Sequence, residues 1–199
     1  MTHPAPNKSI LRRQLKAQRA SVTLDARRAA SQRVLRLALR HGLLLRARRI
    51  GFYLPCGAEF DLRPLMNQAL WMKRECCLPV IPAARGRVLR FARLNGHNVM
   101  TANRYGIPEP SDARPLRARQ LDVLFVPLVG FDDHGHRLGM GGGYYDATLA
   151  YRKRHRLWKK PLMIGVGFEC QHVAILPHDP WDAPLDAVLT ERQLVFFKS

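Results

Sequence analysis

Residues 139–143 hold four glycines in five positions, and no other part of the chain constrains the fold as strongly. Glycine loses more conformational freedom on ordering than any other residue, so such a run is favourable only where the backbone needs positive φ or lies against a ligand. The run follows the clearest buried-strand pattern, LDVLFVP at residues 121–127, and precedes a segment that we expect to be helical. A strand, a glycine-rich turn and a helix in this order present successive backbone N–H groups to an anion.

The rest of the sequence alternates between helical and extended patterns. Helices are predicted over residues 8–20, between the N-cap Thr23 and Gly42, and over residues 61–73. Strands are predicted over residues 50–54, 76–81, 88–94, 162–168, 188–190 and 194–197, with a turn at Arg85 and Gly86 and a loop over residues 103–110. This alternation predicts an α/β fold, a three-layer Rossmann-like domain with a mostly parallel central sheet flanked by helices. We expect residues 1–199 to form a single domain, with the N-terminal helices, residues 8–49, packing on the α/β core.

Composition excludes several classes of protein. The formal net charge of +18 attracts polyanions, but the basic residues are scattered along the chain, so we expect a solvated basic surface and no nucleic-acid partner. No apolar run is long enough to span a membrane, and we expect a cytoplasmic protein, with a monomer favoured. The four cysteines form no C-x-x-C pair, which disfavours zinc and predicts buried free thiols, with Cys76 and Cys77 on opposite faces of a strand.

Candidate ligand-binding residues lie where the strands end, because parallel sheets bind ligands at the carboxyl ends of their strands. Glu59 and the glycine run both follow strands in this way. Lys8 and Arg12 are four residues apart on one helix, so they form either an anion clamp or two solvated cations on a shared face. Arg137, just before the glycines, adds a guanidinium fork that suits phosphate oxygens. The run matches neither the Walker pattern nor the dinucleotide fingerprint, which would need a glycine at Tyr144.

Carboxylates follow the glycine run and recur near the C-terminus. Asp146 is equally compatible with a magnesium ligand beside phosphates and with a helix cap. Asp179, Asp182 and Asp186 lie in the run HDPWDAPLDAVLT, and one of them could complete a metal site, although spacing does not select which. His134 and His136 flank Gly135, and the Asp-Asp-His-Gly sequence at residues 132–135 favours a turn over an acid–base role.

These residues together resemble a known family. RLGMGGGYYD, residues 137–146, is similar to the signature of the 5-formyltetrahydrofolate cyclo-ligases, also called methenyltetrahydrofolate synthetases. Three further blocks agree in order, KSILR, GFYLPCGAEFD and LPHDPWDAPLDAVLT, so that the resemblance spans essentially the whole chain. The family activity that this implies is the ATP- and Mg²⁺-dependent conversion of 5-formyltetrahydrofolate to 5,10-methenyltetrahydrofolate. ADP and phosphate are released, and the reaction passes through a phosphorylated formyl intermediate.

The resemblance also implies roles for individual residues. Lys8 and Arg12 would contact ATP, and its phosphates would be wrapped by Arg137, Leu138, Gly139, Met140, Gly141, Gly142, Gly143, Tyr144 and Tyr145. The folate would face Leu54, Glu59, Tyr144 and Tyr145. Asp146 and Asp182 would hold magnesium, and Arg137 and Tyr145 would take part in catalysis.

The sequence departs from the family pattern at three positions. Many bacterial members carry arginine where this chain has Ala147, and some relatives carry a basic residue in the glycine run, where this chain has Met140 and Gly142. These changes remove possible phosphate contacts. Two alternatives stay open: a different ATP-dependent enzyme on the same scaffold, and a basic nucleic-acid-binding protein.

Overall fold

A seven-stranded sheet forms the centre of the molecule. The computed structural model describes residues 7–82, 86–111, 115–154 and 160–197. The strand order is β11-β10-β9-β6-β1-β2-β3. The strands are β1 (Arg49–Gly51), β2 (Glu75–Val80), β3 (Arg90–Arg93), β6 (Val123–Pro127), β9 (Leu162–Val166), β10 (Ala187–Leu189) and β11 (Leu194–Phe196). The five inner strands are parallel, and the edge strands β3 and β11 are antiparallel to their neighbours.

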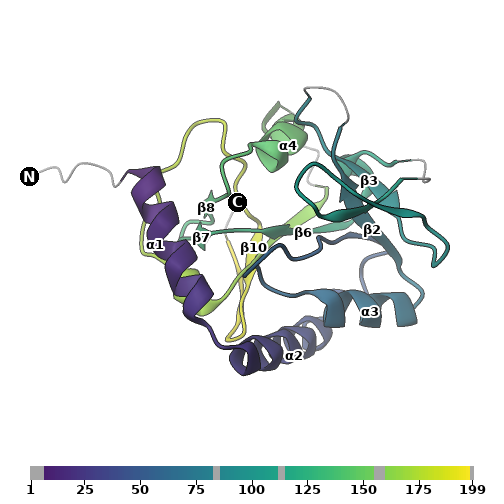
Figure 1. Cartoon of the computed structure of the whole chain (residues 1–199), viewed down its shortest axis with the longest axis horizontal. Coiled ribbons are helices and arrows are strands. Elements are labelled where there is room, and N and C mark those ends of the chain that lie inside the picture. The colour runs from purple at the N-terminus through teal and green to yellow at the C-terminus, as the bar shows by residue number, and fades with distance from the viewer. Residues whose placement is uncertain (1–6, 83–85, 112–114, 155–159, 198–199) are drawn as a thin grey trace, which may run out of the picture.

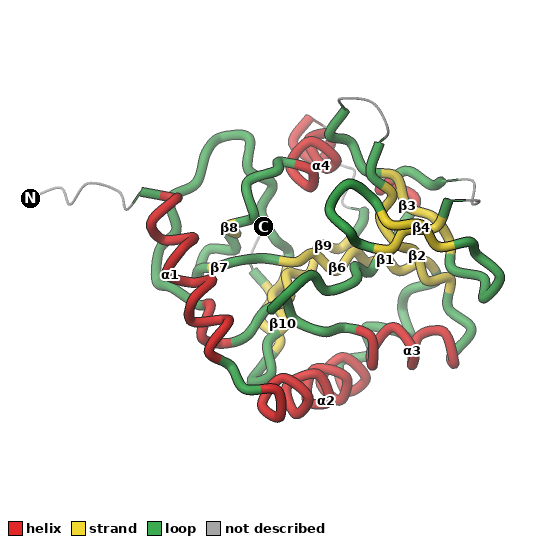
Figure 2. Tube along the Cα trace, viewed as in Figure 1, coloured by secondary structure: helices red, strands yellow, loops and turns green. Residues whose placement is uncertain are grey.

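Helices cover both faces of this sheet (Figure 1). Helices α2 (Leu24–Arg40) and α3 (Arg63–Trp71) cover one face, and α4 (Tyr144–Arg154) covers the other. Helix α1 (Lys8–Ser21) stands at the end of the sheet, beside the short hairpin of β7 (Gly130–Phe131) and β8 (Arg137–Leu138), as the tube view in Figure 2 also shows. The predicted three-layer α/β architecture with a mostly parallel sheet is therefore confirmed.

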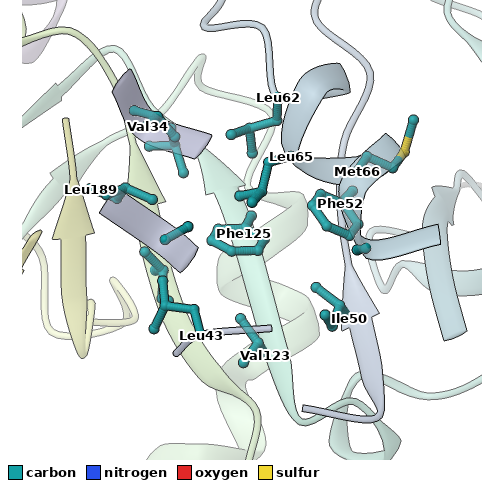
Figure 3. Close-up of a cluster of buried hydrophobic side chains, with 14 of the residues drawn as sticks. Val34, Leu43, Ile50, Phe52, Leu62, Leu65, Met66, Val123, Phe125 and Leu189 are labelled. Atoms are coloured by element: carbon teal, nitrogen blue, oxygen red, sulfur yellow. The ribbon is translucent and has the colours of Figure 1, made fainter. Parts of the chain in front are cut away.

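Each face of the sheet has its own hydrophobic cluster. The cluster under α2 and α3 includes Val34, Leu65 and Phe125, and Figure 3 shows their side chains converging. The cluster under α4 includes Leu149. Cys76 belongs to the first cluster and Cys77 to the second, so adjacent side chains of β2 face opposite layers as predicted. Burial raises the pKa of both thiols to about 12.

Several sequence predictions are wrong in detail. Cys56 and Cys170 are exposed instead of buried. The strand expected at 50–54 ends at Gly51, although the Phe52 amide still donates to the Cys77 carbonyl at 2.8 Å. The loop expected over 103–110 contains strand β5 (Pro108–Pro110), which pairs with β4 (Met100–Ala102). A strand containing two prolines is possible because β5 pairs on one side only, so the other edge needs no ladder donor.

The remaining predicted elements agree with the structure to within two residues at each end. The hairpin β7–β8, which has two-residue strands, was not predicted. Arg85, in the predicted turn, lies outside the described residues. Residues 133–135 form the expected turn, because the buried Asp132 carboxylate accepts from the amides of His134 and His136, each at 2.9 Å. Within the described ranges, no helix has the length and apolar character needed to cross a bilayer.

Asp186, a weaker candidate metal ligand, has a structural role. Its carboxylate binds Arg152 Nη2 through both oxygens, at 2.7 and 2.9 Å, and accepts from the Met163 amide at 2.6 Å. We expect Asp186→Ala to lower the free energy of unfolding by about 2–3 kcal/mol, because it leaves a part-buried guanidinium and an amide unpaired. Urea denaturation measures this. Asp25→Ala is the control, since Asp25 pairs with Arg28 only on the surface and its loss should leave the midpoint unchanged.

Candidate active site

The start of the N-terminal helix α1 contacts the acidic segment near the C-terminus. Lys8 Nζ donates to Asp179 Oδ2 at 2.6 Å and to Asp182 Oδ2 at 2.9 Å. The Asp179 amide also donates to Asp182 Oδ2, at 2.9 Å. Partial burial disfavours the charged form of Lys8, but the bonds to the two carboxylates outweigh it and raise the pKa of its ammonium. Lys8 is therefore a paired cation at the site and not a solvated one.

Arg12, one turn further along α1, fixes the glycine run. Its Nε donates to the Gly139 carbonyl at 2.8 Å, across 127 positions of sequence. A Cβ atom on Gly141 would lie 3.9 Å from Arg12 Cζ, so the guanidinium lies along this part of the loop. Lys8 and Arg12 thus act from one face of α1 on two different segments: Lys8 binds the acidic segment, and Arg12 binds the glycine run.

The backbone of the glycine run has the conformation that its composition suggests. Gly141 and Gly143 have φ values of +100° and +68°, which side chains rarely adopt. At Gly142, a Cβ would approach the Tyr144 ring within 2.9 Å, whereas at Gly139 it would enter open space. Met140 is exposed, but the Leu138 side chain is buried against Leu15, Val129 and Leu176. Leu138 could therefore contact a ligand only through its backbone.

Arg137 and Asp146 form a largely buried ion pair behind the loop. Arg137 Nη2 and Nη1 lie 2.7 and 3.2 Å from Asp146 Oδ1, and the Arg137 side chain is only 5% exposed. The Ala183 amide donates to the same oxygen at 3.1 Å. Because Ala183 follows Asp182 in the chain, this bond brings the two predicted metal ligands, Asp146 and Asp182, to one place. Arg137 is held by a carboxylate, so it is not a free fork for phosphate.

The free oxygens of these carboxylates fit a magnesium ion. Asp146 Oδ2 and Asp182 Oδ1 have no hydrogen-bond partner among the described residues. In those same parts of the chain, no group of three or more His, Cys, Asp or Glu side chains could hold a metal. Magnesium usually takes one or two carboxylates and completes its shell with water and substrate phosphates. The donor set therefore suits Mg²⁺ beside a nucleotide and disfavours an all-protein metal site.

Helix α4 begins with two tyrosines that face different surroundings. Tyr144 Oη lies 2.9 Å from Tyr105 Oη, and the two rings meet edge to face at a centroid distance of 6.1 Å. The Tyr144 carbonyl accepts from Thr148 Oγ1 at 2.6 Å, and that hydroxyl accepts from the Leu89 amide at 2.8 Å. These bonds tie the end of the glycine run to the segment before β3, so the start of α4 is held on two sides.

Tyr145 lies near Glu59 and Tyr53, which belong to the segment that follows β1. The Glu59 carboxylate accepts from the Cys56 amide at 3.0 Å, and Tyr53 Oη donates to the Phe60 carbonyl at 2.9 Å. Burial raises the pKa of Glu59, against the effects of that hydrogen bond and of the Arg19 charge. Burial and the Glu59 charge likewise raise the pKa of Tyr145, so its phenol stays protonated and can donate. Leu54 packs partly buried against the core nearby.

Three residues near the site were not predicted from the sequence. Tyr105 reaches Tyr144 from the β4–β5 hairpin. Arg87 lies along the glycine run, since a Cβ on Gly143 would be 3.6 Å from its Nη1. Arg19 is buried on α1 near Glu59. Tyr105 and Arg87 come from segments that sequence patterns do not connect to the glycine run. Arg19 lies on the same helix as Lys8 and Arg12, and its burial could not be read from the sequence.

The fold and the site define an α/β protein with a glycine-rich strand-to-helix turn beside paired carboxylates and cations. The chain belongs to the 5-formyltetrahydrofolate cyclo-ligase family, whose model matches residues 4–191. It is similar to the 5-formyltetrahydrofolate cyclo-ligase of Haemophilus influenzae, at 35% identity over 182 residues that cover 90% of this chain and 95% of the relative. The Escherichia coli K12 protein of the same name is 33% identical over 185 residues, covering 90% and 98%.

Solved structures agree with this assignment. The structure of Aquifex aeolicus 5,10-methenyltetrahydrofolate synthetase superposes with a TM-score of 0.81 at 30% identity, covering 96% of this chain and 93% of that one. A 5,10-methenyltetrahydrofolate synthetase from Mycoplasma pneumoniae gives a TM-score of 0.72 at 22% identity, which shows the shared fold. The family resemblance that the four sequence blocks suggested is therefore confirmed.

Proposed function

We propose that this protein catalyses the ATP- and Mg²⁺-dependent conversion of 5-formyltetrahydrofolate to 5,10-methenyltetrahydrofolate, with release of ADP and phosphate. The observation that carries the proposal is the positive-φ glycine run between Arg12 and the Asp146–Asp182 pair. Backbone amides, cations and two free carboxylate oxygens in one place suit a metal-bound triphosphate. We expect residues 1–199 to act as one domain, as a monomer in the cytoplasm.

The proposed reaction has two covalent stages. The formyl oxygen attacks the γ-phosphorus of ATP and ADP leaves, which gives a phosphorylated formyl intermediate. The bridging nitrogen of the folate then attacks the formyl carbon, its proton is lost, and the carbon–oxygen bond to phosphate breaks. Such transfers need mainly positioning and neutralisation of charge, so no protein nucleophile is required.

Each residue has a defined part in this proposal. Arg12 and the glycine amides hold the phosphates, and Arg137 holds Asp146 in place. Asp146 and Asp182 would hold Mg²⁺, which supplies positive charge to the phosphate oxygens. Tyr145, protonated because its pKa is raised, donates a hydrogen bond toward the reacting groups instead of acting as a base. Leu54, Glu59 and Tyr144 would line the folate pocket.

The activity is tested directly by following the absorbance of the methenyl product. Purified protein is mixed with 5-formyltetrahydrofolate, ATP and Mg²⁺, and the signal should require all three. A folded protein that binds ATP and forms no product would contradict the substrate assignment. A panel of other formyl and carboxyl compounds would then identify a different ATP-dependent reaction. Steeply salt-dependent oligonucleotide binding that ATP does not affect would instead favour the nucleic-acid alternative.

The raised pKa of Glu59 predicts an acid limit to folate recognition. Its carboxylate must be ionised to accept from folate N–H groups, so kcat/KM for the folate should fall as pH drops through a pKa above the ordinary glutamate value. Glu59→Gln should lower kcat/KM at neutral pH by about 10- to 100-fold, since a hydrogen bond to a charged group contributes about 1.5–3 kcal/mol. Profiles of kcat/KM from pH 5 to 9 measure both effects.

Two control measurements accompany these profiles: kcat/KM for ATP over the same pH range, and the unfolding midpoint of Glu59→Gln. In the folded state burial penalises ionised Glu59, so ionisation as pH rises through the raised pKa lowers stability, and Glu59→Gln should not destabilise the protein. If kcat/KM of Glu59→Gln for the folate still falls at low pH as in the wild type, a group other than Glu59 causes that fall.

A further inference from the structure

Arg19 is a buried cation that has no matching carboxylate in the part of the chain that the structure describes. Its residue exposure is 5%, and its buried Nε has no hydrogen-bond partner in that part of the chain. The only hydrogen bond of its guanidinium among the described residues is from Nη1 to the Leu128 carbonyl, at 3.4 Å, which is long for an N–H···O contact. Buried charges are normally paired or fully hydrogen-bonded, so this arrangement suggests that a bound ligand accepts hydrogen bonds from the guanidinium.

The Arg19 guanidinium lies near the Glu59 carboxylate. Its charge acts on both Glu59 and Tyr53, yet no ion pair links Arg19 to any carboxylate in the described ranges. Arg27 fixes this arrangement. It donates through Nη2 to the Arg19 carbonyl and through Nη1 to the Ala58 carbonyl, the latter at 2.7 Å, so the end of α1 is tied to the residue before Glu59.

The Arg19 guanidinium and the Glu59 carboxylate lie close together without an ion pair between them, so they offer hydrogen-bond donors beside acceptors. The ligand edge that matches this set has a hydrogen-bond acceptor next to N–H donors. The pterin ring of a folate has such an edge, because its C4 carbonyl oxygen adjoins N3–H and the 2-amino group. Arginine is well suited to such planar recognition.

We propose that Arg19 is a specificity residue for the folate, donating to the C4 carbonyl oxygen of the pterin while Glu59 accepts from N3–H and the 2-amino group. This inference rests on the proposed function, since it assumes that a folate binds beside Glu59. The bound carbonyl supplies the partner that the buried guanidinium lacks in the free protein.

The test compares two ligands that differ at the C4 position. Folic acid carries the 4-oxo group, and aminopterin carries a 4-amino group that cannot accept from arginine. Dissociation constants for both are measured by calorimetry with the wild type, Arg19→Met and Arg19→Lys. We expect Arg19→Met to weaken folic acid binding at least about tenfold and to leave aminopterin binding unchanged. Arg19→Lys, which keeps the charge and loses the fork, should lie in between for folic acid.

Equal losses for the two ligands, or no loss for either, would overturn the proposal, because a purely structural role cannot distinguish a carbonyl from an amino group. Arg13→Met is the matched control, since Arg13 is exposed on the same helix and should change neither constant. If Arg19→Met does not fold, the same difference is measured with Arg19→Lys. If the wild type converts 5-formyltetrahydrofolate but the variants lose folic acid and aminopterin affinity to the same extent, only the role of Arg19 is contradicted. A folded wild type that binds neither folate would contradict the proposed function as well.

Discussion

Asp146→Asn should reduce formation of the methenyl product by at least about 100-fold at saturating substrates. The substitution removes one of the two carboxylates proposed to hold Mg²⁺, and it also removes the charge opposite the buried Arg137 guanidinium. Asparagine keeps an oxygen that can accept from the Ala183 amide, so the backbone contact to the acidic segment is preserved. Initial rates measured over a Mg²⁺ titration should show a lower maximum and a shift of the midpoint to higher concentration.

Asp133→Asn makes the same chemical change outside the site. The Asp133 side chain is 64% exposed, and within the described ranges its one hydrogen bond is to His172 Nε2, so this variant should keep wild-type turnover and the wild-type Mg²⁺ midpoint. The thermal midpoint of Asp146→Asn is recorded as well, because an unpaired Arg137 destabilises the fold. Wild-type turnover in a folded Asp146→Asn protein would rule out the assignment of Asp146 to the metal.

Arg12→Met should lower kcat/KM for ATP by about 100-fold, which corresponds to the loss of about 2.7 kcal/mol of charge-assisted hydrogen bonding. Arg12 acts twice in the structure, because its Nε holds the Gly139 carbonyl and its guanidinium lies along Gly141. Without it the loop loses an anchor and the phosphates lose a cation. Steady-state kinetics with ATP varied at saturating folate measure the change, and the KM for the folate should rise much less.

The neighbouring Arg13 provides the comparison for this variant. It is exposed and has the same charge on the same helix, so Arg13→Met tests whether lowering the net charge of +18 is enough to weaken ATP binding. We expect Arg13→Met to match the wild type at moderate ionic strength. Equal losses in the two variants would mean that the long-range field, and not the position of Arg12, determines ATP affinity.

Local patterns predicted the layers of the fold because buried strands and amphipathic helices carry their periodicity in the sequence. The same reasoning failed at residues 108–110, where Pro108 and Pro110 suggested a loop but a single edge pairing with β4 allows a strand. The family resemblance selected Asp146 and Asp182, and the structure brings them together through Ala183. Arg19 was beyond prediction, since its importance comes from being buried with no carboxylate partner among the described residues. That depends on how α1 packs beside Leu128, which the sequence does not show.

The bonds from Lys8 to Asp179 and Asp182 join residues 171 and 174 positions apart, nearly the full length of the chain. During synthesis the first helix therefore leaves the ribosome long before its partners exist, and the acidic segment of the site is completed by some of the last residues to be translated. A chain that terminates before residue 179 would have the glycine run and Arg12 but neither carboxylate partner of Lys8, and it would lack Asp182, the second carboxylate of the proposed magnesium site. Prematurely terminated copies should therefore be inactive even where much of the sheet can form.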